Sequence, residues 1–287
     1  MQHEQERPAG VVGGGTMGCG IAQCLADAGR RVVVLEPDAG ARESGPGRLR
    51  DGARLAGLLR RARRKPDKMV ADVRWTDRWA ELGTASFVIE AGPERVPVKE
   101  ETFRLLDEHC APDAVFASCT SAIPIGHLAA RTRRPDQVLG MHFMNPAPLK
   151  DTVEVIRTDR TSEATLREAT RLLSAMGKKG LVVSDAPGFV SNRVLMLTVN
   201  EAATVLQQGT ADAATVDAVF QDCLGHPMGP LRTADLIGLD TIVDTLEVLR
   251  EFTGDDRFEP CALLTRLVRE GRLGRKSGGR GLHEAPS

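Results

Sequence analysis

The stretch at residues 10–36, GVVGGGTMGCGIAQCLADAGRRVVVLE, constrains the fold of this chain more than any other part of the sequence. A short apolar run at residues 11–12 leads into a glycine-rich turn, and apolar residues then recur at helical spacing over residues 17–28. Gly29 is placed to end that helix, and residues 32–35 form a second buried apolar run. This order of strand, turn, helix and strand predicts the first unit of a dinucleotide-binding sheet.

Three glycines in the turn follow the spacing Gly13-x-Gly15-x-x-Gly18, and each has a physical role. Gly13 permits the tight turn, Gly15 lets the backbone approach a pyrophosphate, and Gly18 lets the helix pack closely on the strand. The free N–H groups at the start of the helix and the positive end of its dipole face the phosphates. Because such a spacing also occurs in ordinary glycine-rich loops, the prediction depends on the flanking strand and helix.

An acidic residue, Glu36, ends the second strand, where it can accept hydrogen bonds from an adenosine ribose. Its carboxylate would repel the additional phosphate of NADP, although Arg30 and Arg31 just before the strand would suit that cofactor. We therefore predict NAD. The expected cofactor-binding residues of this region are Gly13, Gly15, Thr16, Met17, Gly18 and Glu36.

The alternation of strands and helices continues as far as residue 185. Further buried strands are expected near residues 86–90, 115–118, 138–142, 153–156 and 181–183. Beyond them only helical periods follow. The predicted fold class is α/β, with a Rossmann-type doubly wound, mainly parallel sheet that binds NAD over residues 1–185. An all-helical substrate and dimerisation domain is predicted over residues 186–287.

The segment at residues 37–65 is rich in arginine and is expected to contain a helix. Its apolar face is predicted to consist of Leu55, Leu58, Leu59 and Ala62, and its basic residues are Arg54, Arg60, Arg61, Arg63, Arg64 and Lys65. One interpretation is a solvated helix face. The other is a basic surface that meets a phosphorylated substrate arm or an acidic carrier protein.

The composition argues against several function classes. A formal net charge of -1 over 287 residues disfavours general binding to polyanions, and an aromatic content of 3% without tyrosine leaves little for stacking on nucleic acid. Six cysteines without a CxxC pair indicate neither a metal cluster nor a disulfide framework. No apolar run approaches the ~20 residues of a membrane span, and the first residues, MQHEQERPAG, lack the apolar core of a signal peptide. We therefore expect a cytoplasmic protein that has no metal site and binds neither nucleic acid nor membrane.

A histidine, His142, ends one predicted strand, and Glu154 opens the next on the same edge of the sheet. A histidine paired with a carboxylate can take a proton from a substrate hydroxyl while hydride leaves for the cofactor. The remaining histidines, His3, His109, His127, His226 and His283, are expected to be ordinary surface or core residues.

The sequence resembles the L-3-hydroxyacyl-CoA dehydrogenase family, which includes bacterial 3-hydroxybutyryl-CoA dehydrogenases, over nearly its whole length. The matching stretches are GGGTMGCGIAQ, VIEAGPE, FASCTSAIPI, GMHFMNPAPLKDTVEVI, DAPGFVSNRV, HPMGPLRTADLIGLD and LVREGRLGRKSG. The resemblance implies that His142 is the general acid and base with Glu154 as its partner, and that Ser121 and Asn192 hold the reacting oxygen of the substrate. It also implies that Glu94 and Lys99 lie beside the cofactor and that Asn145 lines the same pocket.

Several positions depart from the family pattern. Cys119 stands where most members have asparagine, the segment at residues 37–87 is shorter than usual, and residues 279–283 replace an aromatic ending. Lys150-Asp151-Thr152 is more polar than usual, which would suit a charged or polar acyl group. These differences leave open a second substrate, a hydroxymalonyl-type unit on an acyl carrier protein of polyketide-type biosynthesis, beside an acyl-CoA.

Two further classes share a Rossmann start. Dehydrogenases of the β-hydroxyacid or UDP-sugar type use a lysine or cysteine in the interdomain helix region, where this chain has Asn192. A non-catalytic NAD-binding protein would require a broken site, yet all four implied catalytic residues are present. A homodimer is also predicted, because Leu195, Val199, Ala202, Val205 and Leu206 make the long helix apolar over a wide arc, although an intramolecular core would explain that arc equally well.

Overall fold

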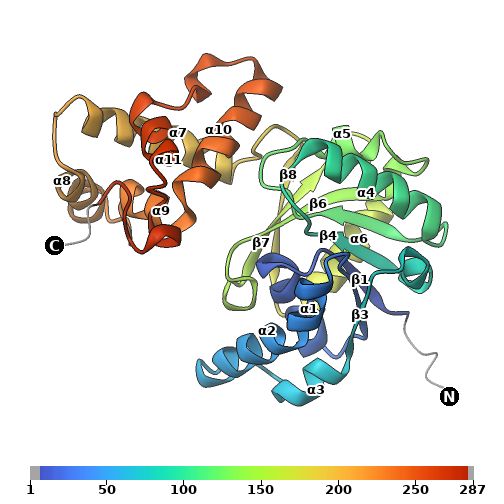
Figure 1. Ribbon diagram of the computed structural model, residues 1–287. Helices are drawn as coiled ribbons and strands as arrows, with labels where there is room; N and C mark the ends of the chain where they lie inside the picture. Colours follow the sequence, from blue (N-terminus) through green and yellow to red (C-terminus); the bar gives the residue numbers. More distant parts are fainter. Residues whose placement is uncertain (1–6, 284–287) are drawn as a thin grey trace. The chain divides into compact units, whose positions relative to one another are not determined.

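The computed structural model describes residues 7–283, which form two compact units. The first unit holds the chain up to Thr120 and again from Pro124 to Ala186, and the second holds Ser121–Ile123 and the chain from Pro187 onward. Figure 1 shows strands flanked by helices in the first unit and helices alone in the second. The division predicted from sequence, after residue 185, does not include the short excursion at Ser121–Ile123.

The first unit is built on an eight-stranded sheet of order β3-β2-β1-β4-β5-β6-β7-β8. Its strands are β1 (Ala9–Val12), β2 (Val32–Leu35), β3 (Val73–Thr76), β4 (Phe87–Glu90), β5 (Val115–Ser118), β6 (Val138–Phe143), β7 (Thr152–Arg157) and β8 (Lys179–Ser184). Its α-helices are α1 (Thr16–Asp27), α2 (Ala39–Leu58), α3 (Pro66–Ala71), α4 (Val96–His109), α5 (Ile125–Ala129) and α6 (Glu163–Ala175). The predicted Rossmann-type, mainly parallel sheet is confirmed.

One pair of strands departs from the parallel arrangement. β7 pairs with β6 in the antiparallel sense, and β8 then runs parallel to β7. As a result the amino end of β7 lies at the same edge of the sheet as the carboxyl end of β6. That edge is where ligands bind in open α/β sheets.

The predicted apolar face of α2 is wrong in its register. The buried residues at helical spacing are Leu49, Ala53 and Ala56, whereas Leu55, Leu58 and Leu59 are 51%, 83% and 53% exposed. The helix ends at Leu58, and Arg60 has a φ of 55°, so the helical period that would group these leucines with Ala62 is broken. The tip of α2 therefore presents leucine side chains to solvent.

The second unit has its own apolar core. Its helices are α7 (Ser191–Gln207), α8 (Ala213–Ala218), α9 (Pro230–Ile237), α10 (Leu239–Thr253) and α11 (Ala262–Arg269), with a π-helical turn at Val219–Cys223 after α8. Val199 and Ala202 of α7 are buried in this core, and Leu195, Val205 and Leu206 pack against it. The apolar arc of α7 is thus largely accounted for within one chain, and the homodimer stays a prediction. No helix in the described part of the chain has the length and apolarity needed to cross a lipid bilayer.

The last described residue, His283, ties the carboxyl-terminal segment to α8 and α9. Its Nδ1 is hydrogen-bonded to the Asp235 carboxylate at 3.0 Å, and its Nε2 lies 3.0 Å from the Asp217 carboxylate. Asp235 also accepts the backbone N–H groups of Leu282 and His283. A Cβ on Gly281 would lie 1.9 Å from Asp235 Oδ1, so this close approach requires glycine. Residues 279–283, which replace the family's aromatic ending, therefore include the glycine and the histidine that hold this segment against Asp235.

We expect His283→Ala to lower the free energy of unfolding of the second unit by about 1–3 kcal/mol, because two largely buried carboxylates lose their imidazole neighbour. The measurement is urea denaturation followed by circular dichroism. Glu251→Ala on the exposed side of α10 is the matched control and should change stability by less than about 0.5 kcal/mol. Equal stability of the two variants would show that the histidine contact contributes nothing.

Candidate active site

The glycine turn after β1 has the geometry of a phosphate cradle. Gly13 has a φ of +96°, and a Cβ there would lie 2.7 Å from the carbonyl oxygen of Ala91. A Cβ on Gly18 would lie 1.8 Å from the carbonyl oxygen of Gly13, so no side chain fits between α1 and the turn. A Cβ on Gly15 would meet nothing within 4 Å, and no side chain caps the first N–H groups of α1. The open space and the N–H donors fit the pyrophosphate of a dinucleotide.

The Glu36 carboxylate is fixed directly beside this turn. Its Oε2 accepts the N–H of Gly14 at 2.7 Å, and its Oε1 accepts the N–H of Asp38 at 2.9 Å. A carboxylate has about four acceptor positions, so further positions remain for the two hydroxyls of a ribose.

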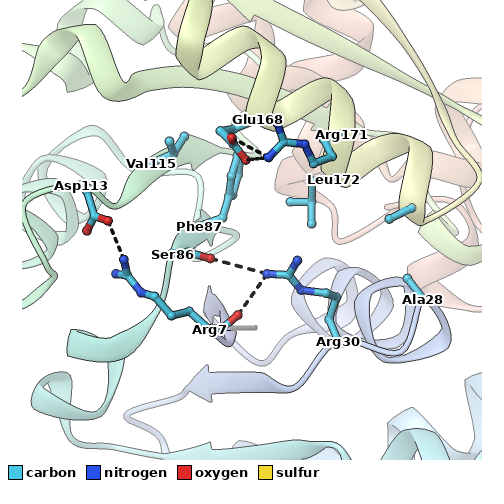
Figure 2. Close-up of a pocket in the computed structure, with 11 residues that line it drawn as sticks. Arg7, Ala28, Arg30, Ser86, Phe87, Asp113, Val115, Glu168, Arg171 and Leu172 are labelled. Atoms are coloured by element: carbon cyan, nitrogen blue, oxygen red, sulfur yellow. Dashed lines mark hydrogen bonds and ion pairs between the residues drawn. The ribbon is translucent and has the colours of Figure 1, made fainter. Parts of the chain in front are cut away.

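Arg30 lies at the other end of the strands. It donates to the carbonyl oxygen of Arg7 at 3.0 Å and borders a cavity of about 640 Å³ formed where β4 and β5 begin (Figure 2). Glu36 follows the carboxyl end of β2, whereas Arg30 precedes its amino end. Arg30 therefore does not supply a binding group for the phosphate that distinguishes NADP.

A buried polar network joins the carboxyl ends of β4 and β5 to α4. The Lys99 ammonium lies 2.8 Å from both carboxylate oxygens of Glu90 and 3.4 Å from Glu94 Oε2. Ser118 donates to Glu90 at 2.7 Å, and Thr120 donates to Glu94 at 2.5 Å. Although burial by itself lowers the pKa of Lys99, the two neighbouring carboxylates raise it above its ordinary value. Lys99 is therefore held as a cation.

Sequence reasoning named Glu94 and Lys99 but missed Glu90, which is only 1% exposed. Glu90 is the last residue of a buried apolar strand and lies opposite Ser118 in the register of β4 and β5. An acidic residue at the end of an apolar run, next to a strand ending in serine, was the available signal.

His142 and Glu154 face each other across the antiparallel pair of β6 and β7. His142 Nδ1 lies 3.2 Å from Glu154 Oε2, and both side chains are buried. A carboxylate at Nδ1 favours the tautomer that carries its proton there, which leaves the Nε2 lone pair as the base. The structure thus brings this predicted pair together in the arrangement that acid–base catalysis requires.

Ser121 and Asn192 are brought together in the second unit. Asn192, in the first turn of α7, donates to the carbonyl oxygen of Ser121 at 2.8 Å, and Gly188 N–H donates to the carbonyl oxygen of Ala122 at 3.0 Å. These bonds hold the excursion at Ser121–Ile123 against the start of α7. The roles of both side chains toward a substrate stay predictions.

Asn145 lies in the connection between β6 and β7, and its peptide bond to Pro146 is cis. The Lys178 ammonium donates to the carbonyl oxygens of Ala147 and Lys150, at 2.7 and 2.6 Å, and thereby braces this connection. A cavity of about 200 Å³ lies between α1, α2 and the connection. It is lined by Thr16, Leu49, Leu55, Asn145 and Pro148 among others.

Two of the departures from the family pattern can now be interpreted. Asp151 forms an ion pair with Arg61, whose Nη1 lies 3.0 Å from both carboxylate oxygens. Asp151 therefore ties the segment that follows α2 to the connection between β6 and β7, and it is no evidence for a charged acyl pocket. Cys119 is buried, and burial raises the pKa of its thiol to about 12, so the thiol is neutral and not a nucleophile.

The chain is similar to known proteins over nearly its whole length. The model of the 3-hydroxyacyl-CoA dehydrogenase NAD-binding domain matches residues 8–186, and that of the 3-hydroxyacyl-CoA dehydrogenase C-terminal domain matches residues 188–283. The chain is 43% identical over 275 residues to a probable 3-hydroxybutyryl-CoA dehydrogenase of Bacillus subtilis, covering 96% of each chain. A second probable 3-hydroxybutyryl-CoA dehydrogenase, from Deinococcus radiodurans, is 40% identical over 94% of this chain and 97% of that protein. The crystal structure of (S)-3-hydroxybutyryl-CoA dehydrogenase from Ralstonia eutropha superposes with a TM-score of 0.89 at 36% identity, covering 98% of this chain and 99% of that one.

We expect Glu36→Ser to reduce the preference for NADH over NADPH by about tenfold or more, because the carboxylate that repels a 2′-phosphate is removed. The measurement is the dissociation constant of each reduced cofactor by fluorescence titration. Glu43→Ser on the exposed part of α2 is the control. An unchanged ratio of the two constants would show that Glu36 does not hold the ribose.

Proposed function

The chain belongs to the 3-hydroxyacyl-CoA dehydrogenase family, and we propose that it oxidises a 3-hydroxyacyl thioester, such as 3-hydroxybutyryl-CoA, reversibly to the 3-ketoacyl thioester with NAD. The single observation that carries this proposal is the buried His142–Glu154 pair at the sheet edge where the glycine turn also lies. Family membership sets aside the β-hydroxyacid and UDP-sugar classes, and a non-catalytic role leaves this pair without a purpose.

The proposed mechanism assigns the proton to His142. Bound NAD supplies the hydride acceptor at the carbinol carbon of the substrate. During oxidation His142 Nε2 accepts the hydroxyl proton, and the Glu154 carboxylate stabilises the imidazolium that forms. During reduction the same imidazolium returns the proton to the carbonyl oxygen. Ser121 and Asn192 are proposed to hold that oxygen, so that most of their contribution is positioning.

The thioester arm is proposed to run along α2. On its α2 side the cavity beside Asn145 is lined by Arg48 and by apolar side chains such as that of Leu49. Leu55, which also lines it, and Leu58 near the end of α2 are exposed. Most of the basic segment that follows is already engaged, because Arg61 pairs with Asp151 and Arg64 with Asp72. Arg60 and Lys65 have no carboxylate partner among residues 7–283, so they are the proposed contacts for the phosphates of coenzyme A.

We expect His142→Ala to lower kcat by about 10²- to 10⁴-fold, the usual contribution of a general acid–base group. The affinity for NADH should change little, because the glycine turn and Glu36 remain intact. Turnover is followed by nicotinamide absorbance with acetoacetyl-CoA and NADH. His226→Ala, an exposed position, is the control. Turnover of His142→Ala within a few-fold of the unmodified protein would remove the histidine from the mechanism.

A second substrate class, the same acyl group on an acyl carrier protein, would use the same catalytic residues. The relatives reported above are named for CoA substrates, which favours the CoA thioester. We expect kcat/KM to be higher for 3-hydroxybutyryl-CoA than for the matched carrier-bound substrate. A higher kcat/KM for the carrier-bound substrate would contradict this expectation. If that preference disappeared in Leu58→Ser, the exposed tip of α2 would be identified as a carrier-protein contact.

A further inference from the structure

The indole of Trp75 fills the space behind the glycine turn. Trp75 lies in β3 and is partly buried against the core of the first unit. A Cβ on Gly14 would lie 2.7 Å from Cζ3 of the indole, and a Cβ on Gly45 of α2 would lie 2.4 Å from its Cη2. Both atoms belong to the six-membered ring. The indole therefore packs between the turn and α2, in space that is available only because both positions are glycine.

Gly14 is held on three sides by residues that follow it in the chain. Its N–H donates to Glu36 Oε2 at 2.7 Å, and its carbonyl oxygen accepts from the Arg48 guanidinium at 2.7 Å. The indole of Trp75 covers the position where a side chain would begin. That same position lies 3.2 Å from Oε2 and 3.3 Å from Cβ of Glu36. The indole and the Glu36 side chain thus border the same small space.

We propose that Trp75 is a positioning residue for cofactor selectivity and that it acts through Glu36. The inference rests on the cofactor of the proposed function and extends it. A carboxylate excludes the 2′-phosphate of NADPH only while it stays at the ribose. Two backbone N–H groups hold the Glu36 carboxylate, and one of them belongs to Gly14.

The indole keeps both partners of this hydrogen bond in place. A ring packed at contact distance leaves no room for Gly14 or the Glu36 carboxylate to move toward β3. Removing the ring leaves a cavity into which both can relax. The carboxylate can then turn away from the ribose, so NADH loses hydrogen bonds while NADPH escapes repulsion. The two cofactors are affected in opposite directions.

The test measures the dissociation constants of NADH and NADPH by isothermal titration calorimetry, without substrate. Trp75→Ala should lower the ratio of the NADPH constant to the NADH constant by about three- to tenfold, part of the effect expected for losing the carboxylate itself. In a Glu36→Ser background the same substitution should change the ratio by less than about twofold, because the group through which Trp75 acts is absent. An equal change in both backgrounds, or a parallel weakening of both cofactors, would overturn the proposal.

A substitution in α2 tests the same contact from the other side of the ring. Gly45→Ala places a methyl group against the indole and should lower the ratio in the same direction as Trp75→Ala. Gly47→Ala, in the same helix, is the matched control and should leave the ratio unchanged, because a Cβ there would meet nothing within 4 Å. If melting curves show that Trp75→Ala does not fold, the comparison of the two glycine variants decides. An unchanged ratio in Gly45→Ala would then overturn the proposal.

Failure of this inference differs from failure of the proposed function. No turnover is measured, so the result does not depend on which thioester is oxidised. If NADH binds and its preference over NADPH is the same in the Trp75 and Gly45 variants, only this inference is overturned. If the unmodified protein binds neither cofactor, the cofactor of the proposed function is overturned as well.

Discussion

The contact between Gly13 and Gly18 is the constraint on which the rest of the site depends. A Cβ on Gly18 would overlap the Gly13 carbonyl oxygen, so α1 can begin directly on the turn only when both positions lack side chains. This contact directs the N–H groups of α1 toward the open space over Gly15 and leaves β1 beside β4 at the point where the strand order reverses. The position of the dinucleotide follows from this contact. The roles of the other polar groups at the carboxyl edge of the sheet depend on where the dinucleotide lies.

The second requirement is the reversal of β7. In an all-parallel sheet, the strand after β6 would bring its carboxyl end to the catalytic edge, and a glutamate near its start would lie far from His142. Because β7 is antiparallel, Glu154 near its amino end lies directly opposite His142. The connection that makes this reversal is short, and its carbonyl oxygens are bonded by Lys178 while Asp151 is bonded by Arg61. The register of the catalytic pair is therefore supported by the segment that follows α2 and by the residue that precedes β8.

Much of this arrangement could be predicted from sequence, because its determinants are local. Glycine spacing and apolar runs identified the first β-α-β unit. Polar residues at strand ends made the His142–Glu154 pair a candidate, and the family resemblance gave it its role. The buried face of α2 could not be predicted, because leucines are compatible with either face of an arginine-rich helix. Only packing against the sheet decides which face is covered. Glu90 was missed for a related reason. A buried acid is stable only beside a suitable partner, here the lysine nine residues further along the chain, and the sequence does not show that these two residues pair. The excursion at Ser121–Ile123 was missed because the change from alternating strands and helices to helices alone marks a single boundary in the sequence. This chain crosses between its two units more than once.

Carboxylates recur along the carboxyl edge, and their partners give them different chemistry. Glu36 is held by two backbone N–H groups, which leave its remaining acceptor positions for hydroxyl donors. Glu90 is held by an ammonium and a hydroxyl, which satisfy its buried oxygens and let it fix the Lys99 side chain. Glu154 is held by an imidazole, a group that can both accept and donate a proton, so this carboxylate supports proton transfer. The same functional group thus selects a ribose, fixes a cation and supports a base, according to whether its partner is an amide, an amine or a histidine.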